Sequence, residues 1–311
     1  MNRSRPELTI AVCSHNPSPV RLERTLAALR AQTLAPDRWE LLLVDNASTK
    51  PLAATWPIAW HPGTRHLHEP ELGIAAARIR AMREARADLL LFVDDDNLLA
   101  PNYAERALAR AAAEPGLGCF GGQLVPEFEQ PPEEWTRVWW PYLAIRPLTA
   151  DRRATGPRHY DSIPPTAGMV VRRVVWEHYL RLCAWDARHL RLGVWGDRRV
   201  GGEDLDLALC SLDRGLGTGC LAELTLTHLM PASRLTEDYL VSLVEGIAFS
   251  TVLLEGLWAN GSGGAAPERL GQLAQLREWL RAWRLPDRTG RFYRAQLTGR
   301  RAGYAALRQR G

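Results

Sequence analysis

The first hundred residues alternate short apolar runs with helical segments, and this alternation is the strongest constraint on the fold. Residues 8–13, 39–44 and 89–93 are predicted to be buried strands, and residues 66–68 a further short one. Residues 20–32 and 74–87 carry leucine or alanine at helical spacing. Strands that alternate with helices in this order predict an α/β fold with a mostly parallel central sheet flanked by helices.

Three of the predicted strands end in polar residues. Ligands of parallel sheets bind outside the carboxyl ends of the strands, where the connecting loops converge. We therefore expect these strand ends to form one site. Its members are Ser14, His15 and Asn16 after the first strand, Asp45 and Asn46 after the second, and Asp94, Asp95 and Asp96 after the strand at residues 89–93.

The three adjacent aspartates indicate a metal and phosphate site. Neighbouring carboxylates repel one another and raise each other's pKa unless a cation or hydrogen-bond donors compensate. Their oxygens suit Mg2+ or Mn2+, which bind one or two protein carboxylates together with phosphate groups. The alternative is a solvated turn whose aspartates cap the helix expected from residue 101. Capping needs only one aspartate, so the pattern favours the metal.

Two further acidic positions each have a functional and a structural interpretation. Asp45 suits a hydrogen bond to a ribose hydroxyl or a base N–H, and it equally suits an Asx turn with Ser48. Glu203 and Asp204 begin a predicted helix, where the helix dipole stabilises an anion. Either carboxylate is placed for general-base catalysis on a hydroxyl acceptor. An acidic first turn is also common in ordinary helices.

Two nitrogen-bearing side chains late in the chain complete the candidates. His228 ends a predicted strand at residues 224–228, and a neutral imidazole can complete a Mn2+ site. Arg234 follows shortly after it and has the geometry for two hydrogen bonds to a diphosphate. Each signal is weak by itself, because a histidine at a strand end is usually an ordinary surface residue.

The net charge of +4 is unevenly distributed. After Pro267 the chain has eleven arginines and three acidic residues, an excess of eight positive charges that leaves the preceding part near −4. This asymmetry predicts a peripheral contact of the tail with a membrane or a protein. The alternative is a helical pair that packs onto the body. Lys50 is the only lysine, so arginine abundance is general in this chain, and no nucleic-acid partner is expected.

Cysteine usage and hydropathy predict the compartment. The five cysteines are scattered and include no Cys-x-x-Cys pair, which favours buried thiols in a reducing compartment. Polar residues interrupt the apolar stretch at residues 240–257, so a buried or amphipathic helix is expected there rather than a membrane span. The sequence starts without an apolar signal region. We expect a cytoplasmic protein, peripheral at the inner membrane face if the tail binds lipid.

The motifs and their order resemble glycosyltransferase family 2, whose members are inverting enzymes of the GT-A fold. The resemblance covers residues 8–234 and implies a GT-A domain at 1–234, divided into a nucleotide-sugar-binding half (1–125) and an acceptor-binding half (126–234). A helical, arginine-rich extension (235–311) follows. The matching motifs are Ser14-His15-Asn16, Val44-Asp45-Asn46, Leu72-Gly73 with Arg78, Val93 with the three aspartates, Gly202-Glu203-Asp204 and Thr227-His228.

The resemblance also implies a role for each matching residue. Asp204 would be the catalytic base, with Glu203 beside it. Mn2+ or Mg2+ would be the cofactor, with Asp96 and His228 as ligands. Asp45 would hold the nucleobase, and Asp94 the ribose or base. The whole nucleotide-sugar site would comprise Ser14, His15, Asn16, Asp45, Asn46, Gly73, Arg78, Asp94, Asp95, Gly168 and Arg234.

Two residues depart from the family pattern. His15 stands where an aromatic residue is more frequent, which bears on base preference, and Asp95 stands where a small apolar residue is frequent. The second departure leaves open which carboxylate, Asp95 or Asp96, ligates the metal.

The expected activity is inverting, metal-assisted transfer of a sugar from a nucleoside-diphosphate sugar, with UDP-sugars favoured. The acceptor would be a glycan, lipid-linked or small-molecule hydroxyl. One alternative is a sugar-1-phosphate nucleotidyltransferase, which expects a glycine-rich basic loop that Ser14 to Pro17 does not supply. Another is a binding protein that has kept the GT-A fold without turnover.

Overall fold

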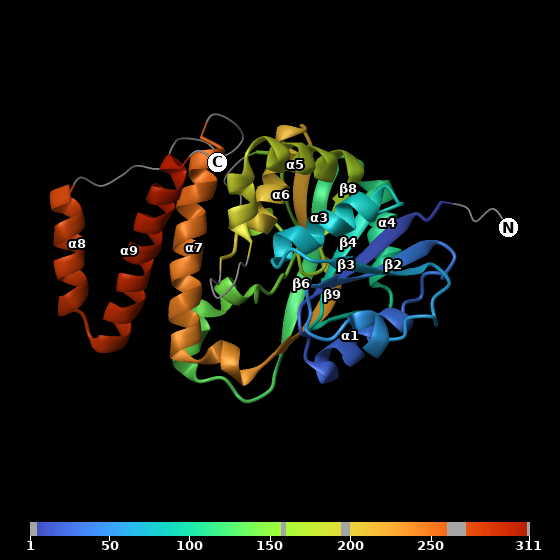
Figure 1. The fold of residues 1–311 in the computed structure, drawn as a ribbon, viewed down its shortest axis with the longest axis horizontal. Helices are drawn as coiled ribbons and strands as arrows, with labels where there is room; N and C mark the ends of the chain where they lie inside the picture. Colours follow the sequence, from blue (N-terminus) through green and yellow to red (C-terminus); the bar gives the residue numbers. More distant parts are fainter. Residues whose placement is uncertain (1–4, 157–159, 194–199, 260–271, 310–311) are drawn as a thin grey trace.

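A computed structural model describes residues 5–156, 160–193, 200–259 and 272–309. It confirms the expected α/β class: helices flank a central sheet, and a helical extension follows (Figure 1). Nine strands among the described residues form one sheet, in the order β3-β2-β1-β4-β8-β6-β9-β5 with β7 paired to β9. They are β1 (Leu8–Ser14), β2 (Trp39–Asn46), β3 (Thr64–Glu69), β4 (Leu89–Asp94), β5 (Asn97–Leu99), β6 (Leu117–Phe128), β7 (Arg152–Ala154), β8 (Val170–Arg172) and β9 (Gly217–Met230).

Parallel pairing dominates the sheet. Strands β3, β2, β1 and β4 are mutually parallel, and β6 is parallel to β9. The shorter strands β5, β7 and β8 pair antiparallel with their neighbours. Strands β1, β2 and β4 each run one or two residues past the predicted end, so Ser14 pairs with Asp45 and Cys13 with Asp94. The register therefore brings the polar strand ends to one edge.

Strand β9 is longer than the predicted segment 224–228, because it begins at Gly217. The glycines in this added part weaken a strand signal in sequence. In the structure they allow close pairing: a Cβ on Gly217 would lie 2.9 Å from the carbonyl oxygen of Ala154 in β7. The missing side chain thus permits the approach of a third strand.

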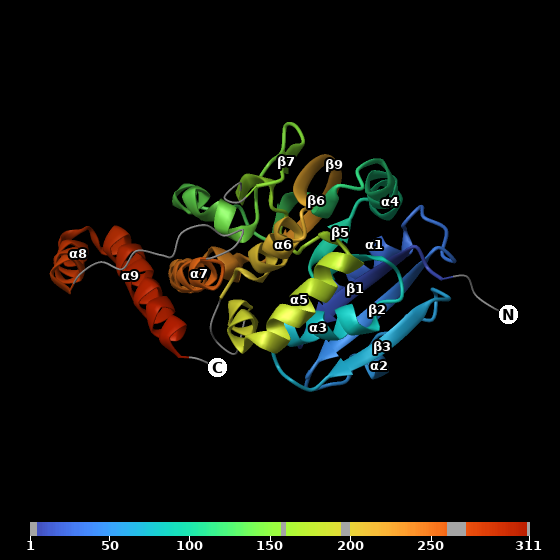
Figure 2. The ribbon, with the colours of Figure 1, turned by 90° about the horizontal axis from the view of Figure 1, so that it is seen from above.

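Both faces of the sheet are covered, and the strand periodicity of two sorts their residues. In β1, Ile10 and Val12 pack with one buried cluster, while Ala11 and Cys13 pack with the other. The first cluster is completed by α1 and α4, and the second by α3, α5 and α6 (Figure 2). These helices are α1 (Pro19–Arg30), α3 (Ile74–Glu84), α4 (Tyr103–Ala113), α5 (Arg173–Trp185) and α6 (Glu203–Asp213). Shorter helical elements are α2 (Leu52–Thr55), η1 (Glu134–Leu143), η2 (Tyr160–Ser162), η3 (Ala187–Leu192) and η4 (Ala232–Leu235).

The extension consists of α7 (Glu237–Leu257), α8 (Gln272–Arg284) and α9 (Asp287–Arg308). Within the described residues, α7 alone is long and apolar enough to cross a membrane, with a mean hydropathy of 1.7. In both views it lies between the sheet-bearing body and α9 (Figures 1 and 2). Phe249 and Leu253 of α7 belong to the same buried cluster as Trp176 of α5. One face of α7 therefore packs into the core of the body in this structure.

Helix α9 approaches α7 closely because two glycines face it. A Cβ on Gly299 would lie 2.0 Å from the carbonyl oxygen of Glu245, and one on Gly303 would lie 2.7 Å from that of Phe249. Such distances are far inside van der Waals contact, so the two helices touch through their backbones. Any side chain at these positions would push α9 away.

We expect Gly299→Ala to destabilise the protein by about 1–3 kcal/mol, because the added methyl overpacks the helix contact. Alanine is intrinsically better than glycine within a helix, so a loss of stability would come from the clash. Chemical denaturation measures the difference, and Gly116→Ala, where no atom lies within 4 Å of the new Cβ, serves as the matched control. Equal stability of Gly299→Ala and the unsubstituted protein would contradict the close packing.

Candidate active site

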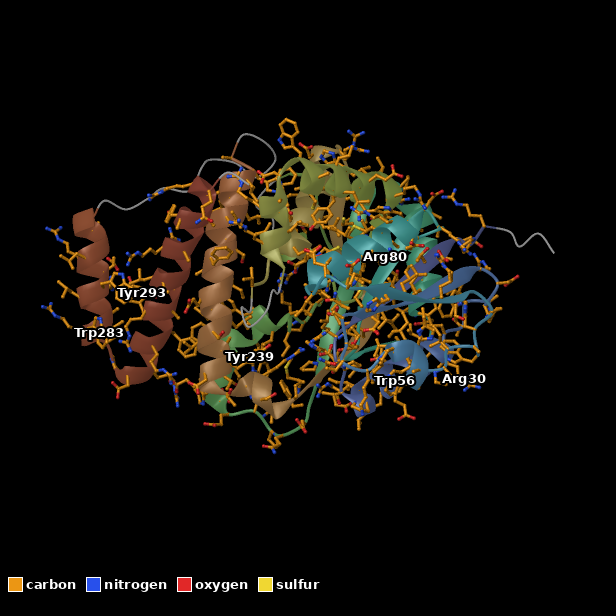
Figure 3. The ribbon with its side chains drawn as sticks, viewed as in Figure 1. Arg30, Trp56, Arg80, Tyr239, Trp283 and Tyr293 are labelled. Carbon is orange, nitrogen blue, oxygen red and sulfur yellow. The ribbon has the colours of Figure 1, made fainter. Side chains whose placement is uncertain are left out.

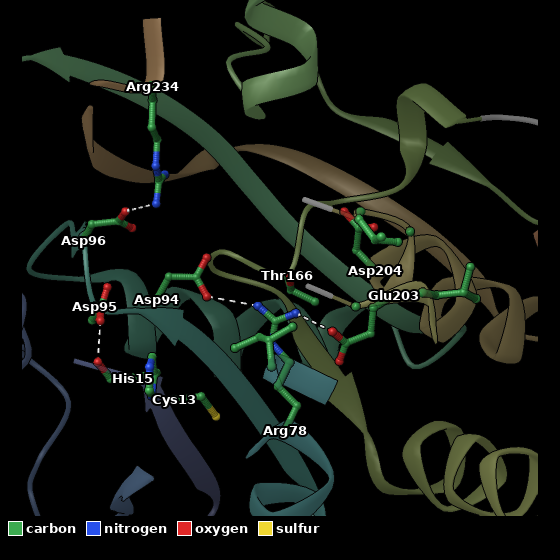
Figure 4. A pocket seen from close by; sticks show the side chains of 17 residues that line it. Cys13, His15, Arg78, Asp94, Asp95, Asp96, Thr166, Glu203, Asp204 and Arg234 are labelled. Carbon is green, nitrogen blue, oxygen red and sulfur yellow. Dashed lines mark hydrogen bonds and ion pairs between the residues drawn. The ribbon is translucent and has the colours of Figure 1, made fainter. Parts of the chain in front are cut away.

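A cavity of about 450 Å3 lies at the carboxyl edge of β1 and β4 (Figure 4). Its walls come from these strand ends, from α3, from the start of α6 and from η4. Sequence-distant segments therefore meet here, as expected for the edge of a parallel sheet. Nine of the predicted site residues line it: Ser14, His15, Arg78, Asp94, Asp95, Asp96, Glu203, Asp204 and Arg234.

Arg78 joins two sides of the cavity. Its guanidinium donates to Glu203 Oε2 over 2.9 Å and to Asp94 Oδ1 over 3.0 Å (Figure 4). Burial disfavours the charged guanidinium, but the two carboxylates outweigh this cost and raise the pKa of Arg78 above its ordinary value. Burial also raises the pKa of Glu203, although Arg78 opposes the shift. The buried Glu203 Oε1 has no hydrogen-bond partner among the described residues.

The three aspartates differ in environment. Burial and the neighbouring Asp96 raise the pKa of Asp95 to about 6, although the Ser14 hydroxyl donates to it. Burial acts against ionisation of Asp96 as well, but His228 and Arg234 outweigh it and hold the pKa of Asp96 below its usual range. Of the three aspartates, Asp96 is therefore the one that has both a lowered pKa and an ion pair with an arginine.

Arg234 contacts both of the predicted metal ligands. It donates to Asp96 Oδ2 over 2.9 Å and contacts His228 Nε2 over 3.0 Å. Asp96 Oδ2 and His228 Nε2 are themselves 3.7 Å apart. The guanidinium therefore supplies the positive charge that this carboxylate needs in its buried setting.

The donor set fits a hard divalent cation. Asp96 and His228 are both buried and converge, and a carboxylate oxygen with an imidazole nitrogen suits Mn2+. Over the described parts of the chain, no group of three His, Cys, Asp or Glu side chains is arranged to hold a metal. Phosphate oxygens and water would have to complete the coordination, as they commonly do for Mg2+.

Asp204 stands at the start of α6, directly after Gly202. Gly202 has φ of +146°, a conformation open to glycine, which turns the chain into the helix. Asp204 is half-buried and lines the cavity, and its Oδ1 accepts from the Leu205 N–H over 2.9 Å. Burial raises the pKa of Asp204 against the opposing effect of the Leu205 hydrogen bond. A carboxylate with a raised pKa is a stronger base than an ordinary aspartate.

Asp45 does not line the cavity. Its two oxygens accept from the Ser48 N–H and the Leu52 N–H, each over 3.0 Å. These bonds outweigh burial and hold the pKa of Asp45 below its ordinary value. The Asx-turn interpretation therefore describes its contacts, and a nucleobase role for Asp45 rests on the family resemblance alone.

The remaining predicted residues shape the loops around the cavity instead of lining it. Asn16 accepts from the Thr49 N–H over 2.9 Å. Asn46 accepts from the Gly73 N–H over 2.9 Å, which ties β2 to the start of α3. Gly168 has φ of +82°, and its carbonyl accepts from the Tyr103 hydroxyl over 2.6 Å.

Comparison with known proteins identifies the family. A family model described as glycosyl transferase family 2 matches residues 9–178, more than half of the chain. The chain belongs to glycosyl transferase family 2. This membership favours sugar transfer over the nucleotidyl-transfer alternative, and it confirms the predicted resemblance.

Curated relatives match this family 2 chain over part of its length. Validoxylamine A glucosyltransferase of Streptomyces hygroscopicus subsp. limoneus is 32% identical over 152 residues, which cover 42% of the chain and 32% of the relative. The putative glycosyltransferase EpsH of Bacillus subtilis (strain 168) is 26% identical over 114 residues, covering 36% and 32%. The chain thus spans about a third of the length of these relatives. A crystal structure of S. aureus TarS 1-349 aligns with 96% of this chain and 91% of that one, at a TM-score of 0.49 and 11% identity.

Sequence reasoning missed a buried network that anchors helix α6 of this family 2 protein. Asp206, in the first turn of α6, is fully buried and accepts from His189 Nδ1 over 2.8 Å and from Trp258 Nε1 over 2.7 Å. The network connects α6 to η3 and to the residue that follows α7. The sequence did contain a signal for this network. Asp206 is the third acidic residue of the run Glu203-Asp204-Leu205-Asp206, and a buried carboxylate needs a hydrogen-bond or ionic partner.

We expect Arg78→Met to destabilise this family 2 protein by about 3–5 kcal/mol, because it leaves Glu203 charged and unpaired in a buried site. Arg24, whose ion pair with Glu127 is exposed, provides the control: Arg24→Met should cost about 0–1 kcal/mol. The double variant Arg78→Met/Glu203→Gln should recover part of the loss. Equal losses of unfolding free energy for Arg78→Met and Arg24→Met, measured by chemical denaturation, would contradict the bridging role of Arg78.

Proposed function

We propose that the chain transfers a sugar from a nucleoside-diphosphate sugar to a hydroxyl group, with inversion at the anomeric carbon. The observation that carries the proposal is the convergence of nine predicted residues on one cavity in a family 2 chain. UDP-sugars are the favoured donors. The acceptor is the hydroxyl of a glycan, a lipid-linked molecule or a small molecule.

In this proposal the donor lies with its diphosphate against Asp96, His228 and Arg234, and with its nucleoside toward Asp94. Asp96 and His228 would hold Mn2+ or Mg2+, which would supply positive charge against the leaving diphosphate. Arg234 donates its N–H groups to phosphate oxygens, a bidentate arrangement that suits guanidinium. Arg78 keeps the Asp94 carboxylate oriented, since it holds one of its oxygens.

Asp204 acts as the base. It accepts the proton of the acceptor hydroxyl while that oxygen attacks the anomeric carbon, and the bond to the nucleoside diphosphate breaks on the opposite face. The raised pKa of Asp204 supports this role, because it makes the carboxylate a better proton acceptor. Glu203 is held by Arg78 and serves as a positioning residue.

We also propose a cytoplasmic location. All five cysteines are buried and unpaired, as expected for a protein kept in a reducing compartment.

Asp204→Asn should lower the turnover of sugar transfer by about 10²–10⁴-fold, because the amide cannot accept the proton. Donor binding, followed by thermal shift with UDP-sugars and Mn2+, should persist. Asp213→Asn, at the exposed far end of the same helix, should leave turnover unchanged. In the unsubstituted enzyme, activity should fall as the pH drops through a pKa above the ordinary aspartate range, since Asp204 must be ionised to act.

Three outcomes would contradict the proposal. Near-normal transfer by Asp204→Asn would remove the base assignment. Release of pyrophosphate from a nucleoside triphosphate and a sugar phosphate would favour nucleotidyl transfer instead. Metal-dependent binding of nucleoside diphosphates without any hydrolysis or transfer would favour the binding protein.

Arg234→Gln should strengthen Mn2+ binding by the donor-free protein, because the guanidinium no longer holds Asp96 Oδ2 and His228 Nε2, the atoms that would bind the metal. The same change should weaken binding of UDP, because a diphosphate contact is lost. Electron paramagnetic resonance reports free Mn2+ directly, and Arg24→Gln, outside the cavity, provides the control. Weaker Mn2+ binding by Arg234→Gln would contradict the competition.

A further inference from the structure

Helix α8 presents an apolar stripe to solvent. Leu276, Leu280 and Trp283 are spaced by four and three residues, so they lie on one face of the helix. Their exposed fractions are 57%, 52% and 68%. Ala282, by contrast, is fully buried. The helix therefore has one face packed and another that leaves three large apolar side chains in water.

An arginine stripe runs beside the apolar one. Arg277, Arg281 and Arg284 each follow one of the three apolar residues by one position, and all three are exposed. Within the described parts of the chain they form no ion pair. On α9, in contrast, Arg288 and Arg291 are neutralised by acidic residues at the start of α7. The charge of α8 is thus available to a partner.

The position of α8 allows it to meet a flat surface. Both ribbon views place it at the outer edge of the molecule, with α9 and then α7 between it and the body (Figures 1 and 2). Figure 3 labels Trp283 on this outer helix. Arg294 of α9 stacks over the Trp283 ring at 4.4 Å and adds a positive charge next to the apolar stripe.

We propose that α8 binds the surface of an anionic lipid bilayer. Leu276, Leu280 and Trp283 would enter the boundary between headgroups and acyl chains, where an amphipathic helix lies in the plane of the membrane. The neighbouring arginines would reach lipid phosphates while their aliphatic stems stay on the apolar side. A stripe of arginines beside an exposed apolar stripe is the pattern of helices that lie on anionic membranes, and it favours a bilayer over a protein partner. This inference does not depend on the chemistry proposed for the cavity.

Vesicle flotation with the full chain tests the proposal without any measurement of transfer. The protein should float with vesicles of phosphatidylcholine and phosphatidylglycerol but not with phosphatidylcholine alone, and high salt should weaken flotation by screening the arginines. Leu276→Ser/Leu280→Ser/Trp283→Ser should lose flotation. Arg277→Gln/Arg281→Gln/Arg284→Gln should lower the partition coefficient at least about tenfold.

Each triple variant has a matched control on other exposed surfaces. Val20→Ser/Val174→Ser/Trp185→Ser removes three exposed apolar residues elsewhere, and Arg30→Gln/Arg83→Gln/Arg86→Gln removes three exposed arginines. Arg30 lies on the side of the molecule away from α8 (Figure 3). Both controls should float like the unsubstituted protein.

Failure of the unsubstituted protein to float with anionic vesicles at low salt would overturn the proposal. Equal flotation by the α8 variants and their controls would also overturn it. The unsubstituted protein could instead fail to float but self-associate in analytical ultracentrifugation. If the α8 variants abolish that self-association, the partner of α8 is a second copy of the chain and not a membrane.

Discussion

The candidate active site depends on one buried cation shared by two carboxylates. Arg78, on α3, reaches Asp94 at the end of β4 and Glu203 at the start of α6, which is 125 residues away in sequence. Glu203 is buried, so its charge without a partner would cost free energy. The guanidinium thus links the strand edge to the helix that carries Asp204, and a fork of N–H groups is a geometry that lysine could not supply.

A division of labour among neighbouring acids follows from the local contacts. Asp96 is stabilised as an anion by His228 and Arg234, while Asp95 and Asp204 have raised pKa values because burial outweighs their contacts. One cavity therefore holds an acid suited to bind cations and another suited to accept a proton. Functional sites commonly separate the pKa values of adjacent groups in this way.

The sequence pattern predicted the strands and the strand ends, which depend on neighbouring residues in the chain. Apolar runs that end in polar residues gave β1, β2 and β4 to within two residues, and the same runs placed the aspartates at the cavity. Contacts between distant segments were not predictable. Asp45 has the same sequence setting as Asp94, yet its oxygens are used by a turn, and nothing in the sequence shows that the Ser48 and Leu52 N–H groups point to it. The contacts of Arg234 with Asp96 and His228 likewise require the fold.

The close approach at Gly299 and Gly303 has a mechanical consequence. Because the backbones of α7 and α9 are in contact, no soft layer of side chains at this point lets one helix slide or tilt against the other. The glycine contact therefore fixes the spacing of α9 and α7, the two helices that lie between α8 and the body. A surface that binds α8 would then connect to the body through helices whose spacing is fixed at this contact.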